Sequence, residues 1–258
     1  MSGAGFRIAI PARYGSTRFP GKPLTLLRGR TMLEHVWRRA CEAGASEVVV
    51  ATDDERVAEA AAGFGAGVCM TRPDHASGTD RLAEVSRLRG WPDDAIVVNL
   101  QGDEPLTPPA LLAQAAEDLA RWPDAPVATL AAALAAGAPV DDPNIVKVVT
   151  DAAGFALYFS RAPIPWWRDG RPTAPEPPTR RHLGIYAYRA GFLQHYTALE
   201  PAPLERAEQL EQLRVLWHGY RIHVTEAATL PGAGVDAPDD VDRVEAALAE
   251  FETGGPSS

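Results

Sequence analysis

The chain has 258 residues, of which 46% are hydrophobic and 23% charged, with a net charge of −9 and two cysteines. This composition is ordinary for a soluble globular protein, and the length suits one large α/β domain or two small ones. The acidic balance argues against binding to a nucleic-acid backbone, and two cysteines are too few for a disulfide framework. Because no apolar run approaches the ~20 residues that span a bilayer, we expect a cytoplasmic protein without nucleic-acid or membrane partners.

The first half of the chain alternates strands and helices. Short apolar runs predict the strands, and apolar residues at helical spacing after capping residues predict the helices. Strands are expected at residues 6–11, 47–51, 68–71 and 95–100, and helices at 31–43, 55–62 and 77–88. This alternation predicts an α/β fold with a mostly parallel, Rossmann-like central sheet flanked by helices, in which ligands bind beyond the carboxyl ends of the strands.

After about residue 125 the pattern becomes richer in strands. Strands are expected at residues 127–132, 145–150, 155–159, 183–188 and 221–225, and helices at 210–218 and 239–251. Residues 170–180 are rich in proline and predict an exposed loop. Because no linker separates the halves, we predict a single domain over residues 1–253, whose second half adds a smaller β-rich extension, followed by a disordered tail at 254–258.

The segment IAIPARYGSTRFPGKPL, residues 8–24, carries the strongest functional signal. A strand opens into a loop with two glycines and the cations Arg13, Arg18 and Lys22, which is typical of phosphate binding at the end of a strand. The loop is not a Walker A motif, because five residues, not four, lie between its glycines and Pro23 replaces the Mg²⁺-binding hydroxyl residue. No G-x-G-x-x-G follows the strand, which disfavours a dehydrogenase. The segment predicts a nucleotide held by another kind of loop.

Carboxylates supply candidate metal ligands. Asp103 follows the strand at 95–100, so the residue pattern fits a Mg²⁺ ligand and a turn residue about equally. Asp236, before a proline-containing turn, is a weaker candidate on its own. Farther along the chain, His182 and Tyr186 are four residues apart on a predicted strand, which places both side chains on one face.

The loop at 8–24 resembles the signature of sugar-nucleotide cytidylyltransferases, most closely the 3-deoxy-manno-octulosonate cytidylyltransferase family, which reads close to IPARYxSTRxPGKPL. The match continues in the family's order through VVVATDD, CMTRPDHASGTDR, VVNLQGDEP, ALYFSRAPIPW, RHLGIYAYRAGF, LEQLRVLWHG and GVDAPDD. The departures, such as Gly15 for a common alanine and Phe19 for a common leucine, remove no charge that the chemistry needs. The resemblance spans nearly the whole chain.

The resemblance implies a set of site residues. Arg13, Arg18 and Lys22 would hold the triphosphate of CTP, and Lys22, Arg13 and Asp103 would be catalytic. Arg72, Ser77, Gly78 and the backbone near Ala12 would enclose the cytidine, and Asp103 with Asp236 would bind Mg²⁺. The sugar acid would contact Gln101, Arg161, His182, Tyr186, Glu211 and Gln212. Residues 1–125 would mainly bind the nucleotide, and residues 126–235 would mainly bind the sugar and form a homodimer.

The implied reaction is attack of the anomeric hydroxyl of 3-deoxy-manno-octulosonate on the α-phosphate of CTP, which gives the CMP-sugar and pyrophosphate for lipopolysaccharide synthesis. No residue pattern indicates a covalent nucleophile, so positioning and charge stabilisation would carry the catalysis. Two alternatives stay open: a cytidylyltransferase for a related sugar acid, such as an 8-amino or sialate-like one, and a non-catalytic nucleotide-binding protein. The presence of both Asp103 and Asp236 argues against the second.

Overall fold

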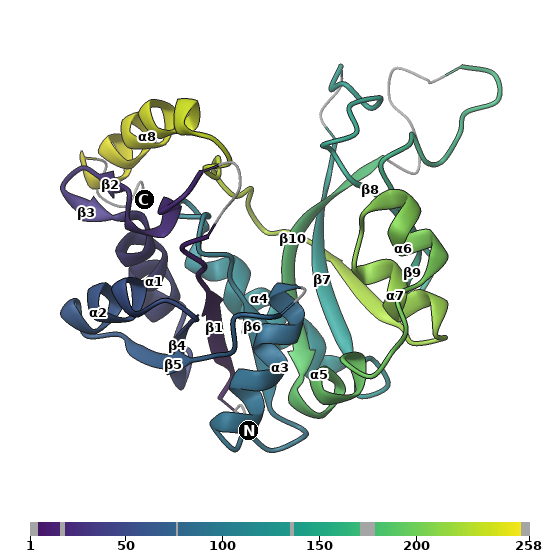
Figure 1. Ribbon diagram of the computed structural model, residues 1–258. Helices are drawn as coiled ribbons and strands as arrows, with labels where there is room; N and C mark the ends of the chain where they lie inside the picture. The colour runs from purple at the N-terminus through teal and green to yellow at the C-terminus, as the bar shows by residue number, and fades with distance from the viewer. Residues whose placement is uncertain (1–4, 16–18, 76, 135–136, 171–178, 254–258) are drawn as a thin grey trace.

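The computed structural model describes residues 5–15, 19–75, 77–134, 137–170 and 179–253 (Figure 1). Within these residues, one sheet of nine strands has the order β11-β7-β10-β6-β1-β4-β5, with β8 paired to β10 and β9 to β8. Arg18, most of the proline-rich loop and the predicted tail lie outside the described residues. The strands are β1 (Arg7–Pro11), β4 (Glu47–Thr52), β5 (Gly67–Met70), β6 (Ile96–Asn99), β7 (Val127–Ala133), β8 (Lys147–Thr150), β9 (Ala156–Ser160), β10 (Arg180–Arg189) and β11 (Ile222–Glu226).

The direction of the strands explains how the two halves of the chain join. Strands β5, β4, β1 and β6 are parallel to one another, as are β7 and β11. Strand β10 runs antiparallel between β6 and β7, so the strands of the second half continue the sheet of the first. This mostly parallel sheet with a β-rich extension and flanking helices confirms the predicted fold class.

Capping residues place several helices where the sequence predicts them. The Thr31 hydroxyl accepts from the Glu34 N–H at the start of α1, Asp54 caps α2, and Ser77 forms a capping box with Asp80 at the start of α3. The helices predicted at 31–43, 55–62, 77–88, 210–218 and 239–251 are confirmed as α1 (Met32–Glu42), α2 (Glu55–Gly63), α3 (Gly78–Leu88), α7 (Gln212–Trp217) and α8 (Val241–Thr253). Within the described residues, no helix is long and apolar enough to cross a membrane.

Other elements were not predicted. They are the helices α4 (Pro109–Arg121), α5 (Ala190–Tyr196) and α6 (Pro203–Glu208), the short hairpin β2 (Leu26–Leu27) and β3 (Arg30–Thr31), and the 3₁₀ turns η1 (Lys22–Leu24) and η2 (Pro238–Asp240). The signal for α4 was present in the sequence, because Leu111, Leu112, Ala115 and Leu119 form one buried stripe at helical spacing after a proline in the first turn.

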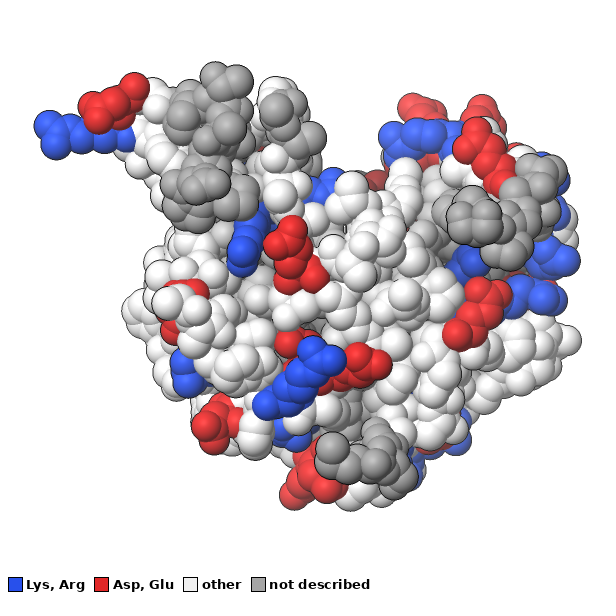
Figure 2. All heavy atoms as spheres, turned by 180° about the vertical axis from the view of Figure 1, so that it is seen from behind, with Lys and Arg blue, Asp and Glu red and all other residues white. Residues whose placement is uncertain are grey.

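Helices cover both faces of the sheet. Apolar side chains of α3, α5 and α7 pack on one face, and those of α1, α2 and α4 pack on the other. A third, smaller cluster joins α8 to the β2–β3 hairpin and to Leu106 in the loop after β6. Figure 1 shows α8 beside this hairpin, on the opposite side of the molecule from β8, α6 and α7. Seen from behind, the surface is hollowed between these two parts (Figure 2).

The loops after β1 and β6 approach each other closely at one edge of the sheet. A Cβ atom on Gly102 would lie 2.9 Å from the Pro11 carbonyl oxygen, so the two backbones meet where only glycine fits. The segment before α8 crosses the same place, because the Val235 N–H donates to the Asp103 carbonyl and the Gly232 N–H to the Leu106 carbonyl. Three segments distant in sequence therefore meet beyond the strand ends.

Candidate active site

Lys22 lies at the centre of this meeting point. Gly21, with φ at +74°, turns the chain into η1, and its N–H donates to the Tyr14 carbonyl, which closes the loop after β1. The Lys22 ammonium then reaches Asp103, with 2.5 Å between Nζ and Oδ2, and donates to the Val235 carbonyl at 2.9 Å. The ammonium is mostly buried, with 13% of the side chain exposed. One cation thus links the first loop, the loop after β6 and the segment before α8.

A cavity of about 450 Å³ opens beside this lysine. Arg13 lies on its wall, and its guanidinium donates to the His75 carbonyl at 2.5 Å. The cavity brings together predicted nucleotide, catalytic and sugar residues from four segments. Its lining consists of Pro11, Ala12, Arg13, Gly15, Lys22, Pro23, Gly78, Gln101, Gly102 and Asp103. The wall of this cavity presents the cations Arg13 and Lys22 together with the carboxylate of Asp103. Such a wall suits a ligand that bears phosphates.

Three carboxylates influence one another near Lys22. Burial, followed by the charges of Asp103 and Asp236, raises the pKa of Glu104 to about 7. Asp103 and Asp236 therefore both lie near Glu104, although 132 residues separate the two in sequence. Among the described residues, no three His, Cys, Asp or Glu side chains form a metal cage by themselves. A cation held here would take Asp103 and Asp236 as oxygen ligands and complete its shell from a bound ligand or water.

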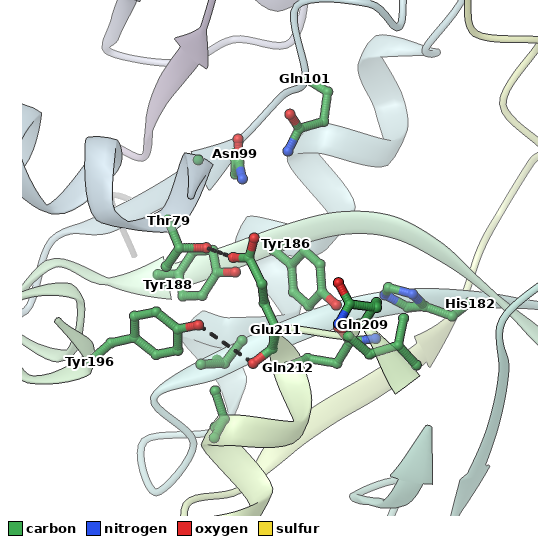
Figure 3. A pocket seen from close by; sticks show the side chains of 14 residues that line it. Thr79, Asn99, Gln101, His182, Tyr186, Tyr188, Tyr196, Gln209, Glu211 and Gln212 are labelled. Carbon is green, nitrogen blue, oxygen red and sulfur yellow. Dashed lines mark hydrogen bonds between the residues drawn. The ribbon is translucent and has the colours of Figure 1, made fainter. Parts of the chain in front are cut away.

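A second cavity, of about 310 Å³, adjoins the first and shares Gly78 and Gln101 with it. Tyr186 of β10, Tyr196 of α5 and Glu211 at the start of α7 converge on it (Figure 3). The Thr79 hydroxyl donates to the Glu211 carboxylate at 3.1 Å, and the Tyr196 hydroxyl is 3.5 Å from the Glu211 carbonyl oxygen. Thr79, Asn99, Val127, His182, Tyr188, Gln209, Leu210, Gln212 and Val215 complete the lining.

The second cavity is rich in groups that donate or accept hydrogen bonds, and Glu211 is the one acidic residue among its described lining residues. Burial lowers the pKa of His182 to about 3, so the imidazole is uncharged, and its Nε2 accepts from the Gly184 N–H at 3.3 Å. Burial also raises the pKa of Tyr186 and of Glu211, so the phenol keeps its proton. Among the described lining residues there is no lysine or arginine. Such a wall suits a ligand rich in hydroxyl groups.

Some predicted residues lie outside both cavities. Arg72 is exposed, with its guanidinium bound to Asp74, and it lines a separate hollow that also contains His75 and Glu84. The Arg161 guanidinium donates to the backbone carbonyls of Glu208, Pro143 and Gln209. The Ser77 hydroxyl is bound to Asp80 in the capping box, directly before the lining residue Gly78. Their predicted contacts with ligands stay predictions.

Several lining residues were not predicted. Tyr188 follows Tyr186 at the spacing that places both on one face of a strand, and Thr79 follows Ser77 and Gly78 in the motif SGT, so both could have been found. Tyr196 and Gln209 belong to α5 and to the end of α6, elements that the sequence pattern did not reveal.

Comparisons with known proteins identify the family of the chain. The family model described as cytidylyltransferase matches residues 8–222. The 3-deoxy-manno-octulosonate cytidylyltransferase of Pseudomonas syringae pv. syringae (strain B728a) is 54% identical over 250 residues, covering 95% of this chain and 98% of the relative. The enzyme of that name from Vibrio vulnificus (strain YJ016) is 55% identical over 247 residues, with the same coverage.

A solved structure gives the same result. The structure of a CMP:2-keto-3-deoxy-manno-octonic acid synthetase complexed with CTP is 45% identical and superposes with a TM-score of 0.88, covering 96% of this chain and 100% of that chain. Sequence and fold therefore agree, and the chain belongs to the 3-deoxy-manno-octulosonate cytidylyltransferase family.

Proposed function

We propose that this protein transfers the CMP group of CTP to the anomeric hydroxyl of 3-deoxy-manno-octulosonate and releases pyrophosphate, as a step in lipopolysaccharide synthesis. The observation that carries the proposal is the pair of adjoining cavities. One has two cations and a carboxylate, the other has hydrogen-bonding groups and no cation among its described lining residues, and Gly78 and Gln101 line both. The reacting phosphate and hydroxyl would meet at this shared wall, and the names of the relatives supply the identity of the two substrates.

The first cavity would hold the nucleotide. Arg13 and Lys22 present positive charge to the triphosphate, and Lys22 is tied to the loop after β6 through Asp103. As pyrophosphate leaves, negative charge grows on its oxygens, and cations fixed in place stabilise that charge without reorganising. The backbone around Ala12, which lines the same cavity, would face the base, and Arg72 and Ser77 would close over it.

Asp103 and Asp236 would hold Mg²⁺. Their donor set fits this ion, because it consists of carboxylate oxygens. The raised pKa of Glu104, to which the charges of both aspartates contribute, supports a concentration of negative charge there. When bound, Mg²⁺ would neutralise phosphate oxygens and make the α-phosphorus more electrophilic. The Lys22–Asp103 ion pair fixes the orientation of the Asp103 carboxylate within the cavity wall.

The second cavity would hold the sugar acid. Neutral His182, protonated Tyr186 and the Gln212 amide offer donors and acceptors to its hydroxyl groups, and Glu211 lies opposite them. Gln101, on the shared wall, would contact both substrates. Arg161 would supply a cation for the sugar carboxylate from the neighbouring loop. These groups would position the attacking hydroxyl of the sugar and so accelerate the reaction by proximity.

The test is a pyrophosphate-release assay over a panel of nucleotides and sugar acids, with EDTA and with added Mg²⁺. We expect release only with CTP and 3-deoxy-manno-octulosonate together, and only with the metal. Asp103→Asn should abolish most turnover while the melting temperature and circular dichroism stay close to wild type. The matched control is Asp124→Asn, in the exposed turn after α4, which should keep full activity. A preference for an 8-amino or sialate-like acid, or near wild-type turnover of Asp103→Asn, would contradict the proposal.

We further propose that the protein is a homodimer. Exposed apolar side chains lie on α7 and on the two elements that it contacts, with Leu157 of β9 62% exposed, Leu204 of α6 38% and Trp217 of α7 53%. Apolar and aromatic side chains of this kind are enriched in the core of interfaces between identical chains. Trp217→Asp should halve the mass measured by light scattering, whereas Leu88→Asp, which changes an exposed leucine of α3, should leave it unchanged.

A further inference from the structure

The reaction proposed above gives no part to His75, yet this residue touches the phosphate-binding wall. The Arg13 guanidinium donates to the His75 carbonyl at 2.5 Å, across 62 positions of sequence. Arg13 belongs to the loop after β1, whereas His75 belongs to the loop between β5 and α3. The direction of the guanidinium therefore depends on where the second loop lies.

Glu84 of α3 fixes that second loop. Its Oε2 atom accepts from the Arg72 N–H at 2.8 Å and from the His75 ring Nε2 at 2.6 Å. Only 10% of the Glu84 side chain and 13% of the His75 side chain are exposed. One carboxylate on a helix thus holds both ends of the segment from residue 72 to residue 75.

The charge state of Glu84 suits this task. Burial by itself would raise the pKa of its carboxyl, but the hydrogen bonds from the His75 ring and the Arg72 N–H outweigh burial and hold the pKa below its ordinary value. The carboxylate is therefore ionised, and the ring nitrogen that faces it must carry a proton. The Arg87 guanidinium is 3.6 Å from the Glu84 carboxylate, but 62% of its side chain is exposed, so it adds little.

We propose that Glu84 and His75 are positioning residues for Arg13. Glu84 holds the His75 ring and the Arg72 N–H, the held loop presents the His75 carbonyl, and that carbonyl directs the Arg13 guanidinium along the wall of the nucleotide cavity. Neither residue lines that cavity. The inference rests on the proposed function only in taking the ligand of Arg13 to be the triphosphate of CTP.

Removing Glu84 should therefore weaken nucleotide binding selectively. Glu84→Ala leaves two donors without their acceptor and frees the loop, so we expect the KM for CTP to rise about 10-fold or more, since small misplacements of positioning groups have effects of this size. The KM for the sugar acid should change much less. Glu84→Gln keeps an oxygen acceptor and should restore most of the CTP affinity. Glu117→Ala, on the exposed side of α4, is the matched control and should leave both constants unchanged.

A double-mutant cycle separates positioning from a merely structural role. CTP affinity is measured by calorimetry for wild type, Glu84→Ala, Arg13→Ala and the double variant, with thermal melts to confirm folding. If Glu84 acts through Arg13, the Glu84 change costs about 10-fold in the wild-type background and almost nothing beside Arg13→Ala. His75→Ala keeps the main-chain carbonyl and should repeat this pattern more weakly. If Glu84→Ala does not fold, His75→Ala takes its place in the cycle.

The outcomes distinguish the two proposals. The positioning role would be overturned if Glu84→Ala lowered CTP affinity equally in the wild-type and Arg13→Ala backgrounds, or raised the KM for CTP and for the sugar acid equally. Product formation by the wild-type protein would still support the proposed function. Wild-type protein that releases no pyrophosphate from CTP and the sugar acid would overturn the proposed function instead. The calorimetric cycle measures the coupling between Glu84 and Arg13 whether or not the protein forms product, because the binding measurement needs only CTP.

Discussion

Replacing Gly102 by alanine tests whether the close approach of two loops sets the geometry of the nucleotide cavity. The new Cβ would lie 2.9 Å from the Pro11 carbonyl oxygen and 3.6 Å from the Ala12 Cβ. The first contact is several tenths of an ångström too short and involves backbone, so one of the loops must move. Such overpacking costs about 1–3 kcal/mol, which corresponds to a fall in Tm of about 2–12 °C for a chain of this size.

The displaced loops carry Arg13 and Lys22 on one side and Asp103 on the other. Because misplacing reacting groups by about 1 Å lowers rates by about 100-fold, we expect kcat/KM to fall by about 10- to 100-fold. Pyrophosphate release and thermal melts measure the two effects. Gly63→Ala is the control, since a Cβ there meets nothing within 4 Å in α2. It should keep full activity and gain about 0.5–1 kcal/mol. Wild-type kcat/KM and Tm for Gly102→Ala would refute the reasoning.

Three further changes test the second cavity and the C-terminal helix. Arg214→Leu leaves the Glu205 carboxylate, to which Arg214 donates at 2.9 and 2.5 Å, buried without its cation. Urea unfolding should show a loss of about 3–5 kcal/mol in the free energy of unfolding, and the KM for the sugar acid should rise. His182 is neutral in the fold with a pKa of about 3, whereas the unfolded chain takes up a proton near pH 6.5. Stability should therefore fall as pH drops below about 6.5, by up to about 1.4 kcal/mol per unit, and His182→Gln should show a shallower slope in urea melts at pH about 5 and about 7.5. Leu248→Ala removes a buried contact of α8 and should cost about 2–5 kcal/mol, whereas Leu88→Ala at an exposed position should cost less than about 0.5 kcal/mol.

The sequence predicted those parts of the fold whose signals are local. Thr31, Asp54 and Ser77 cap their helices through bonds to N–H groups two or three residues away, so the starts of α1, α2 and α3 could be placed closely. The loop after β1 could be assigned to phosphate binding because a strand, glycines and cations follow one another directly.

What could not be predicted depends on contacts between distant segments. The carbonyl groups that bind the Arg161 guanidinium come from residues 18 to 48 positions away, so residue type alone suggested a ligand contact. The same holds for His75, whose carbonyl accepts from Arg13, 62 positions away, and whose ring bonds to Glu84 on α3. His182 and Tyr186 do line one cavity, as expected, but a bulge with Gly184 at φ +73° lies between them, so simple alternation along the strand was not what placed them there.

The bond between Lys22 and the Val235 carbonyl joins residues 213 positions apart, and this separation has a consequence for how the protein is made. Synthesis proceeds from the N-terminus, so the loop after β1 and the strands β1, β4, β5 and β6 emerge first and can begin to fold. Asp236 and the helix α8 that packs on the β2–β3 hairpin arrive last. The Val235 carbonyl and Asp236 therefore join the Lys22–Asp103 pair only when almost the whole chain has been released. Chains that end before residue 235 lack the carbonyl that accepts from Lys22 and the carboxylate of Asp236, so the contacts around Lys22 are completed only late in synthesis.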